Sequence, residues 1–134
     1  MIRYMLDTNT VSSLLKKDSM VIQRINQVPI ASLCISAITE GELLFGLAKR
    51  PEAVRLHAAV NEFLRCVDIL PWDEGVALTY AKTRASLERQ GKTLSPLDLL
   101  IACHAESLGT GLVTNDQAFR LLDGLKMEDW SREN

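Results

Sequence analysis

Short apolar runs alternate with longer amphipathic segments along the chain. The runs are three to five residues long and are closed by turn or cap residues, which is typical of buried strands. The segments between them begin at cap-forming residues and end at glycine or proline, as helices do. The predicted strands cover residues 2–6, 33–35, 67–70 and 112–114, with a candidate edge strand within 125–130.

The predicted helices fall between these strands. Residues 7–10 supply polar caps after the first strand, and Asp73 caps a long segment that ends near Gln90. Ser95 and Pro96 open a helix that is apolar on nearly every side, so we expect it at the centre of the fold. In all, helices are predicted over 11–17, 20–28, from 37 onward, 52–65, 73–90, 95 to 106 or 108, and 117–122.

This alternation predicts the fold class. Repeated strand and helix in one short chain favours an α/β/α sandwich around a parallel sheet of about four or five strands. The 134 residues suit one domain over 1–134, and no repeat or linker divides them. Ligands of such sheets bind beyond the carboxyl ends of the strands, so the polar turns there are the first candidates for chemistry.

The composition excludes several classes of protein. No apolar run approaches the roughly 20 residues of a membrane-spanning helix. Asp7 interrupts the first apolar run where a secretory signal would continue, so a cytoplasmic location is expected. The net charge is −2, and any nucleic-acid surface must therefore be a local patch.

The cysteines and histidines do not form a recognisable site. Cys34, Cys66 and Cys103 contain no C-x-x-C pair and sit in apolar stretches, so buried free thiols are expected. His57 and His104 lie far apart in sequence, without a second His or Cys at a ligand spacing. Zinc binding and serine–histidine chemistry are therefore not supported.

Four acidic residues are expected to meet at one edge of the sheet. Asp7 and Asp116 each follow a predicted strand, and Asp98 and Glu42 lie early in predicted helices. Carboxylates gathered in this way repel one another unless a cation compensates them, and oxygen ligands suit Mg²⁺ or Mn²⁺. Each acid alone is also explained by helix capping, including the capping-box patterns Ser95-x-x-Asp98 and Thr39-x-x-Glu42. The set of four favours a metal site.

Glu40 competes with Glu42 for a place in this cleft. The two residues are about 200° apart on a helix, so only one of them faces the cleft. A helical wheel places Glu42 at the rim of the apolar arc beside Ile38 and Phe45, which favours it weakly over Glu40.

Four motifs and the C-terminal run carry a family resemblance. In chain order they are Met5-Leu6-Asp7-Thr8-Asn9, Ile38-Thr39-Glu40-Gly41-Glu42-Leu43 with Gly46, Ser95-Pro96-Leu97-Asp98 with Ile101-Ala102, Val113-Thr114-Asn115-Asp116 with Phe119, and Glu128-Asp129-Trp130. Together they make the whole chain resemble PIN-domain ribonucleases, and more narrowly the VapC toxins of bacterial toxin–antitoxin pairs. The resemblance implies a PIN-like fold, an endoribonuclease that uses Mg²⁺ or Mn²⁺ and leaves a 5′-phosphate, and neutralisation by a VapB-type antitoxin.

The resemblance also assigns roles to residues of this chain. Its acidic quartet matches Asp7, Glu42, Asp98 and Asp116, which selects Glu42 over Glu40 and implies that Asp7 and Asp98 bind the metal directly. Polar positions beside the acids would orient carboxylates or water, although turn and cap roles explain them equally well. These positions are Thr8, Asn9, Thr114 and Asn115.

Candidate RNA contacts lie before Asp98. Removing the four acids from a net charge of −2 leaves +2 on the rest of the chain, part of which is available for phosphates. The candidates are Lys82, Arg84, Arg89 and Lys92, and the alternative is an ordinary solvated helix face. Because aromatic residues are only 5% of the chain, structured RNA is favoured over extended single strands, with transfer RNA as the leading substrate.

An antitoxin needs an exposed apolar surface. The early helices offer one, with the alternative that its residues belong to the core. The candidates are Leu14, Leu15, Ile38, Phe45 and Leu47. The family resemblance further implies a homodimer that forms a hetero-oligomer with the antitoxin.

Three other functions share parts of this pattern. A haloacid-dehalogenase-type phosphatase needs a second Asp where this chain has Asn9. A phosphoacceptor receiver domain needs an acidic pair after the first strand and a Lys after the last, but Asp7 stands alone and Asn115-Asp116 occupies the Lys region. A catalytically inactive RNA- or protein-binding module would have no use for four mutually repelling acids.

Overall fold

The computed structural model describes residues 2–132 and is built around a five-stranded sheet with the order β3-β2-β1-β4-β5. Every strand pair is parallel, and the register places Met5 beside Cys34 on one side and beside Leu112 on the other. The prediction of a parallel sheet of four or five strands is confirmed. The strands are β1 (Tyr4–Leu6), β2 (Leu33–Ser36), β3 (Asp68–Leu70), β4 (Gly111–Val113) and β5 (Met127–Glu128).

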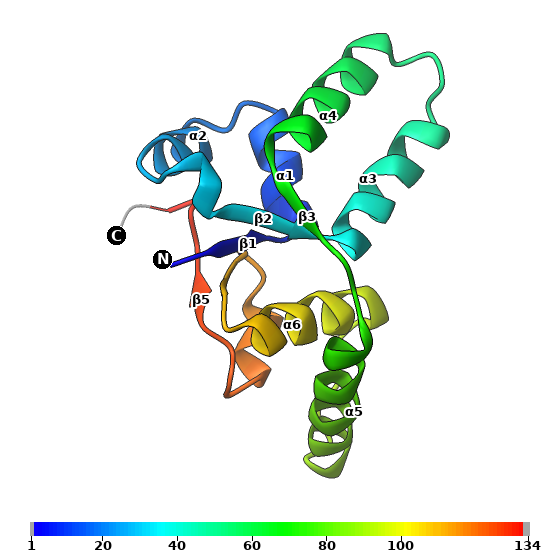
Figure 1. Cartoon of the computed structure of the whole chain (residues 1–134), viewed down its shortest axis with the longest axis vertical. Helices are drawn as coiled ribbons and strands as arrows, with labels where there is room; N and C mark the ends of the chain where they lie inside the picture. The colour runs from blue at the N-terminus through cyan, green and yellow to red at the C-terminus, as the bar shows by residue number, and fades with distance from the viewer. Residues whose placement is uncertain (1, 133–134) are drawn as a thin grey trace.

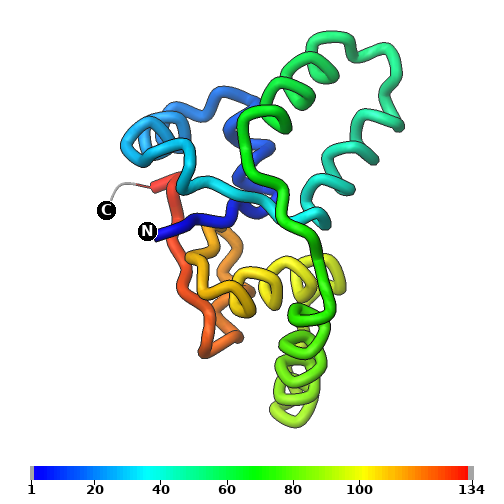
Figure 2. The backbone as a smooth tube through the Cα atoms, in the orientation of Figure 1, coloured from blue at the N-terminus to red at the C-terminus, as the bar shows by residue number. Residues whose placement is uncertain are grey.

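Helices cover both faces of the sheet, as Figure 1 shows. One face carries the first four helices and the other carries the last two, which gives the α/β/α sandwich. The helices are α1 (Thr8–Leu15), α2 (Ser19–Asn26), α3 (Ala37–Ala48), α4 (Val54–Cys66), α5 (Glu74–Arg89) and α6 (Pro96–Leu108), with the 3-10 helices η1 (Ile30–Ser32) and η2 (Gln117–Leu121). The backbone trace in Figure 2 shows α3 and α4 as an arm on one side and α5 projecting on the other.

The two-residue period of the strands divides the core into two clusters. Met5 packs with residues of α5, α6 and η2, whereas its neighbour Leu6 packs with residues of α1, α3 and α4. Cys34 and Ile35 alternate in the same way in β2. Apolar burial on both faces fixes the register of these short strands, because a slip of one residue would exchange the faces.

Several helix ends differ from the sequence prediction. The first helix begins at Thr8 rather than residue 11, because the Asp7 side chain accepts a hydrogen bond from the backbone of Thr10. Ser36 caps α3, so Thr39 and Glu42 do not form its capping box. Ser95 precedes Pro96 without forming a side-chain cap, so the capping box predicted there is also wrong. The short helix after Asp116 is a 3-10 helix.

The thiols were predicted to be buried, and one is not. Cys34 and Cys103 are buried free thiols, and burial raises the pKa of each to about 11. Cys66 is exposed, because it lies in the last turn of α4 on the side turned away from the core. The central helix α6 is buried over most of its length, as predicted.

Within residues 2–132, no helix combines the length and the apolar character that crossing a bilayer requires.

Candidate active site

Asp7 is held at the junction of β1 and β4. Its backbone N–H donates to the carbonyl of Val113 at 3.1 Å, and its Oδ1 accepts from the N–H of Thr10 at 2.8 Å. The hydroxyl of Thr10 donates to the same Val113 carbonyl at 3.0 Å. Asp7 is therefore fixed at the point where the sheet order reverses, which is where α/β sheets bind ligands.

Asp7 is only 3% exposed, and its environment disfavours the charge of the carboxyl group. Burial raises the pKa of Asp7, and the nearby carboxylate of Asp98 raises it further. Hydrogen bonds from Thr114 and Thr10 oppose this effect without cancelling it. A buried carboxylate beside a second acid is a site at which a cation would be stabilising.

Thr8 connects this position to α3. Its hydroxyl donates to Oε1 of Glu42 at 2.7 Å and lies 3.4 Å from the hydroxyl of Thr39. Because Thr8 follows Asp7 directly, the bond places the half-buried Glu42 carboxylate at the first residue of α1. Within the described residues, Glu40 has no side-chain hydrogen bond or ion pair. Glu42, and not Glu40, is therefore the residue of α3 that is hydrogen-bonded to the N-terminus of α1.

Thr114 connects Asp7 to Asp116. Its Oγ1 accepts from the N–H of Asp116 at 3.1 Å, and its side chain is also hydrogen-bonded to Asp7. Asp116 itself caps η2, with Oδ1 accepting from the N–H of Ala118 at 2.9 Å. Asp7 and Asp116 therefore both act as helix caps, and Thr114 interacts with both of them. Asn9 and Asn115 are exposed beside them.

The donor set fits a hard divalent cation held partly by water. Within residues 2–132, no three His, Cys, Asp or Glu side chains are close enough together to enclose a metal ion. Mg²⁺ normally uses one or two carboxylates and keeps several waters, so a closed cage is not needed. Asp98 is near enough to Asp7 for its charge to raise the pKa of the Asp7 carboxyl group, so these two acids lie on the same side of the sheet edge.

The basic residues singled out on and after α5 do not form one patch. Arg84 donates to Glu88 at 2.9 Å and to the hydroxyl of Tyr80 at 2.7 Å, and it lines a groove with Lys92 beside the start of α6. Lys82 lines a different groove, together with Glu106 of α6. Arg89 is exposed near the end of the helix. Arg84 and Lys92 are therefore the pair on the Asp98 side.

The apolar surface predicted on the early helices is present only in part. Phe45 is 62% exposed, whereas Leu47 is buried in the core, so its assignment to the surface is wrong. Leu14, Leu15 and Ile38 are half-buried. A groove of about 250 Å³ runs between α1, α3 and α4, with Thr8 and Glu42 at its edge. Sequence analysis missed the α4 side of this groove, formed by Leu56 and Val60.

One buried polar contact near the site was also missed. Nδ1 of His104 in α6 lies 2.7 Å from Oγ of Ser36, and both residues are fully buried. The same Ser36 oxygen accepts from the N–H of Ile38 at the start of α3. The apolar surroundings of His104 in the sequence gave no signal for this pairing, because Ser36 is 68 residues away.

The fold and the acidic site define a known class of protein. The family model described as PIN domain matches residues 4–125, which is most of the chain. The chain belongs to the PIN domain family. This membership excludes the phosphatase and receiver-domain alternatives.

Within that family the similarity is to VapC ribonucleases. The chain is 37% identical over 133 residues to the tRNA(fMet)-specific endonuclease VapC of Shigella flexneri, covering 98% of this chain and 100% of the relative. It is 35% identical to Ribonuclease VapC2 of Haemophilus influenzae over 132 residues, covering 97% and 99%. The crystal structure of DNA-bound VapBC from Salmonella typhimurium matches with a TM-score of 0.90 and 36% identity, covering 97% of this chain and 99% of that one.

Proposed function

We propose that this chain is the endoribonuclease toxin of a VapBC-type pair and that it hydrolyses phosphodiester bonds in RNA with the help of Mg²⁺ or Mn²⁺. The observation that carries the proposal is the buried Asp7 carboxylate, whose pKa is raised by burial and by Asp98. Within a PIN fold, such an arrangement is best explained by a cation that compensates both charges.

Each side chain of the site has a role in this proposal. Asp7 and Asp98 hold the ion, and the bond from Thr114 keeps Asp7 oriented toward it. Glu42, fixed by Thr8, and Asp116, fixed through the Thr114 loop, extend the acidic surface on either side. When bound, the ion supplies charge neutralisation at the scissile phosphate and lowers the pKa of a water molecule. No histidine base is needed, and the expected product carries a 5′-phosphate.

The proposed substrate is transfer RNA, with initiator transfer RNA as the first candidate. The support is the name of the Shigella relative, a tRNA(fMet)-specific endonuclease, together with its similarity over nearly the whole chain. The protein would act where translation occurs, so we propose a bacterial cytoplasmic location and inhibition of translation as the outcome.

The test is cleavage of purified initiator and elongator transfer RNA by antitoxin-free protein, with mapping of the RNA ends. We expect discrete cuts in initiator transfer RNA with Mg²⁺ or Mn²⁺ and none with a chelator. Glu42→Gln should lower the rate by at least tenfold. Its matched control Glu40→Gln, two residues away on the same helix, should stay within about twofold of the parent.

The outcome separates the proposal from its alternative. Cutting that persists in the chelator and in Glu42→Gln would contradict the metal-dependent site. If the parent binds transfer RNA but cuts no RNA under any condition, the chain is a PIN-fold binding module instead.

We propose a VapB-type antitoxin as the protein partner. The groove of about 250 Å³ between α1, α3 and α4 offers an apolar floor that ends at Thr8 and Glu42, so a segment lying in it would reach the active site. The solved complex from Salmonella typhimurium, a VapBC pair, supports this pairing. We propose that the toxin also forms homodimers, and light scattering of the chain with and without antitoxin gives the stoichiometry.

A further inference from the structure

A second groove, of about 320 Å³, lies at the carboxyl ends of β4 and β5. Its walls come from α2, η2 and the segment after β5, which are far apart in the sequence. Three arginines line it, Arg24, Arg120 and Arg132, together with Gln117, Met127, Glu128 and Asp129. Basic residues therefore outnumber acidic ones along the groove.

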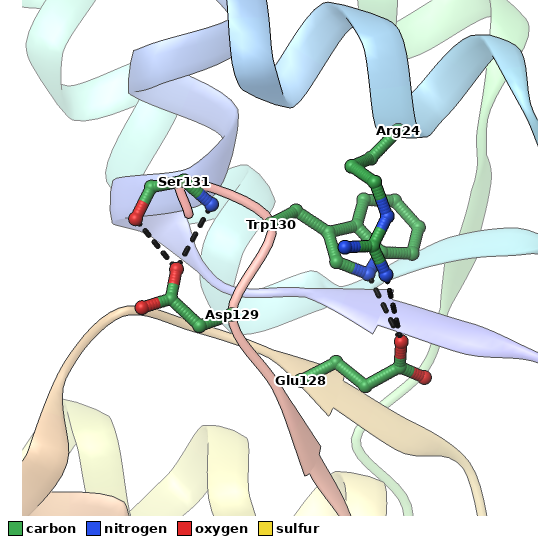
Figure 3. Close-up of polar contacts among 5 residues, drawn as sticks. All are labelled: Arg24, Glu128, Asp129, Trp130 and Ser131. Carbon is green, nitrogen blue, oxygen red and sulfur yellow. Dashed lines mark hydrogen bonds and ion pairs between the residues drawn. The ribbon is translucent and has the colours of Figure 1, made fainter. Parts of the chain in front are cut away.

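The three arginines are held in different ways. Arg24 is mostly buried: its guanidinium stacks on Trp130, 5.7 Å from the ring centroid, and pairs with Oε1 of Glu128 at 3.3 Å (Figure 3). Trp130 Nε1 donates to the same Glu128 oxygen at 3.2 Å. This cluster fixes one wall of the groove and already engages both Arg24 and Glu128.

The other two arginines are available to a ligand. Arg132 is 75% exposed and has a 3.3 Å ion pair with Asp129. The other carboxylate oxygen of Asp129 accepts from the N–H of Ser131 at 2.9 Å (Figure 3). Arg120 lies on the exposed side of η2 and has no ion pair or side-chain hydrogen bond with any residue from 2 to 132. An exposed guanidinium can bind a phosphate in bidentate fashion.

The groove is connected to the acidic residues through the chain and through one hydrogen bond. Gln117, which lines it, directly follows Asp116 in the chain. On the opposite wall, the carbonyl of Glu128 accepts from the N–H of Thr114 at 2.9 Å, and Thr114 is the residue that bonds to Asp7. Because β1, β4 and β5 are parallel neighbours, the groove and the acids share one edge of the sheet.

We propose that this groove binds the phosphate backbone of the RNA substrate next to the cleavage site, with Arg120 and Arg132 as the residues that bind phosphate. The inference rests on the proposed function and extends its substrate site. Four acids repel an approaching polyanion, so the RNA needs adjacent cations to remain in place. Arg120 and Arg132 supply them on the β5 side, away from the residues predicted on α5.

The experiment measures RNA affinity and its salt dependence. RNA binding is measured by fluorescence anisotropy with labelled initiator transfer RNA in the Asp98→Asn background, which prevents cleavage. Arg120→Gln combined with Arg132→Gln should raise Kd by about 5- to 50-fold. It should also reduce the slope of log Kd against log salt by about one for each phosphate that the variant no longer binds.

A matched control uses an arginine outside the groove. Arg55→Gln replaces an exposed arginine at the start of α4, on the arm, and should leave both Kd and slope at the parental values. In cleavage assays without Asp98→Asn, the double variant should raise KM far more than it lowers kcat, whereas general misfolding would lower kcat as well.

The outcomes distinguish this inference from the proposed function. If the parent cuts RNA and the double variant matches it in Kd, slope and KM, the groove is not an RNA site. Loss of antitoxin binding with unchanged RNA affinity would also overturn the proposal and assign the groove to the protein partner. A parent that neither binds nor cuts RNA overturns the proposed function and this inference with it.

Discussion

At the scale of single residues, Asp7 combines a structural task with an unfavourable charge. It caps α1 through Oδ1, yet it is buried beside Asp98 and its pKa is raised. A group whose folded pKa lies above its unfolded value stabilises the fold at low pH, and this stabilisation disappears as the pH rises through the folded pKa. At neutral pH without metal, the Asp7 charge therefore destabilises the fold.

Asp7→Asn should consequently abolish cleavage and stabilise the protein. The amide oxygen retains the cap to Thr10 while the charge is removed. We expect Tm to rise by roughly 2–5 °C at pH 7 in a chelator, with the gain disappearing near pH 4. Thermal unfolding followed by circular dichroism measures this, and a lower Tm for the variant at pH 7 would contradict the assignment of a strained buried charge.

Thr8 acts on Glu42 through its hydroxyl alone. Thr8→Val preserves the size of the side chain and removes the 2.7 Å bond to Glu42. We expect kcat to fall by about 10- to 100-fold with little change in KM, as is usual when a residue that orients a metal-site carboxylate is replaced. Thr8→Ser restores the hydroxyl and should restore most of the rate, and equally low rates in the two variants would show that the hydroxyl is not the important feature.

The polar residues beside the acids were only partly predictable. Thr8 is hydrogen-bonded to Glu42 and Thr114 to Asp7, whereas Asn9 and Asn115 are exposed. The sequence cannot separate Thr8 from Asn9, because a rotation of about 100° along α1 decides which of the two turns inward. Thr114 and Asn115 lie in the turn between β4 and η2, whose course is set by packing.

At the scale of elements, the hydrogen bond between Ser36 and His104 joins the two helices that carry Glu42 and Asp98. Ser36 ends β2 and caps α3, and His104 lies in the buried middle of α6. Burial lowers the pKa of His104, while Asp73 and the backbone of Pro71 raise it to a smaller extent. The imidazole is therefore held neutral in the folded protein at pH 7.

This predicts a loss of stability on acidification. Because the unfolded chain binds the proton more readily, the free energy of unfolding should fall as the pH drops through about 6.5, the ordinary pKa of histidine. His104→Leu should remove that pH dependence and cost about 1–3 kcal/mol, because the Ser36 hydroxyl no longer has its partner. Urea unfolding at pH 5.5 and 7.5 tests both effects, and a parental pH dependence in His104→Leu would contradict the assignment to His104.

The order and type of the elements could be read from the sequence, but several of their ends could not. The capping-box pattern of Thr39 and Glu42 does not cap α3, because Ser36 at the end of β2 caps that helix instead. The prediction that Cys66 is buried was wrong for a related reason. The direction in which its side chain points from the last turn of α4 determines its exposure, and the apolar residues around it in the sequence do not.

At the scale of the whole molecule, α3 and α4 form an arm on one side of the sheet (Figure 1), and a groove lies between them and α1. Phe45 is the aromatic residue of α3 and is exposed, and the ammonium of Lys49 lies 4.6 Å from its ring centroid. Such a surface is favourable only when a partner covers it.

Phe45→Glu should therefore weaken antitoxin binding without harming catalysis. A charge at this exposed position should change the free energy of unfolding little, but it opposes burial of the side chain under a partner helix. We expect the Kd of the toxin–antitoxin complex to rise at least tenfold in calorimetry while RNA cleavage stays within about twofold. Unchanged affinity would show that the antitoxin binds to another surface of the toxin.

The site as a whole was more predictable than the surfaces around it. Asp7 and Asp116 follow the neighbouring parallel strands β1 and β4, so the sequence predicts their position at one edge of the sheet, and Glu42 is bonded to Thr8 beside Asp7. The arginine groove brings residues 24, 120 and 132 together through the packing of three separate segments. No sequence period connects these positions, so only the folded chain reveals them.

The most direct test of the central claim is to measure metal binding and RNA cleavage together. Mn²⁺ binding is followed by electron paramagnetic resonance in the parent, Asp7→Asn, Asp98→Asn and the control Glu40→Gln, and each protein is then given initiator transfer RNA. The account predicts that Asp7→Asn and Asp98→Asn each weaken Mn²⁺ binding by at least about tenfold and abolish the cuts, while Glu40→Gln does neither. If Asp7→Asn and Asp98→Asn bind Mn²⁺ and cut RNA as the parent does, the acidic edge of the sheet is not the active site.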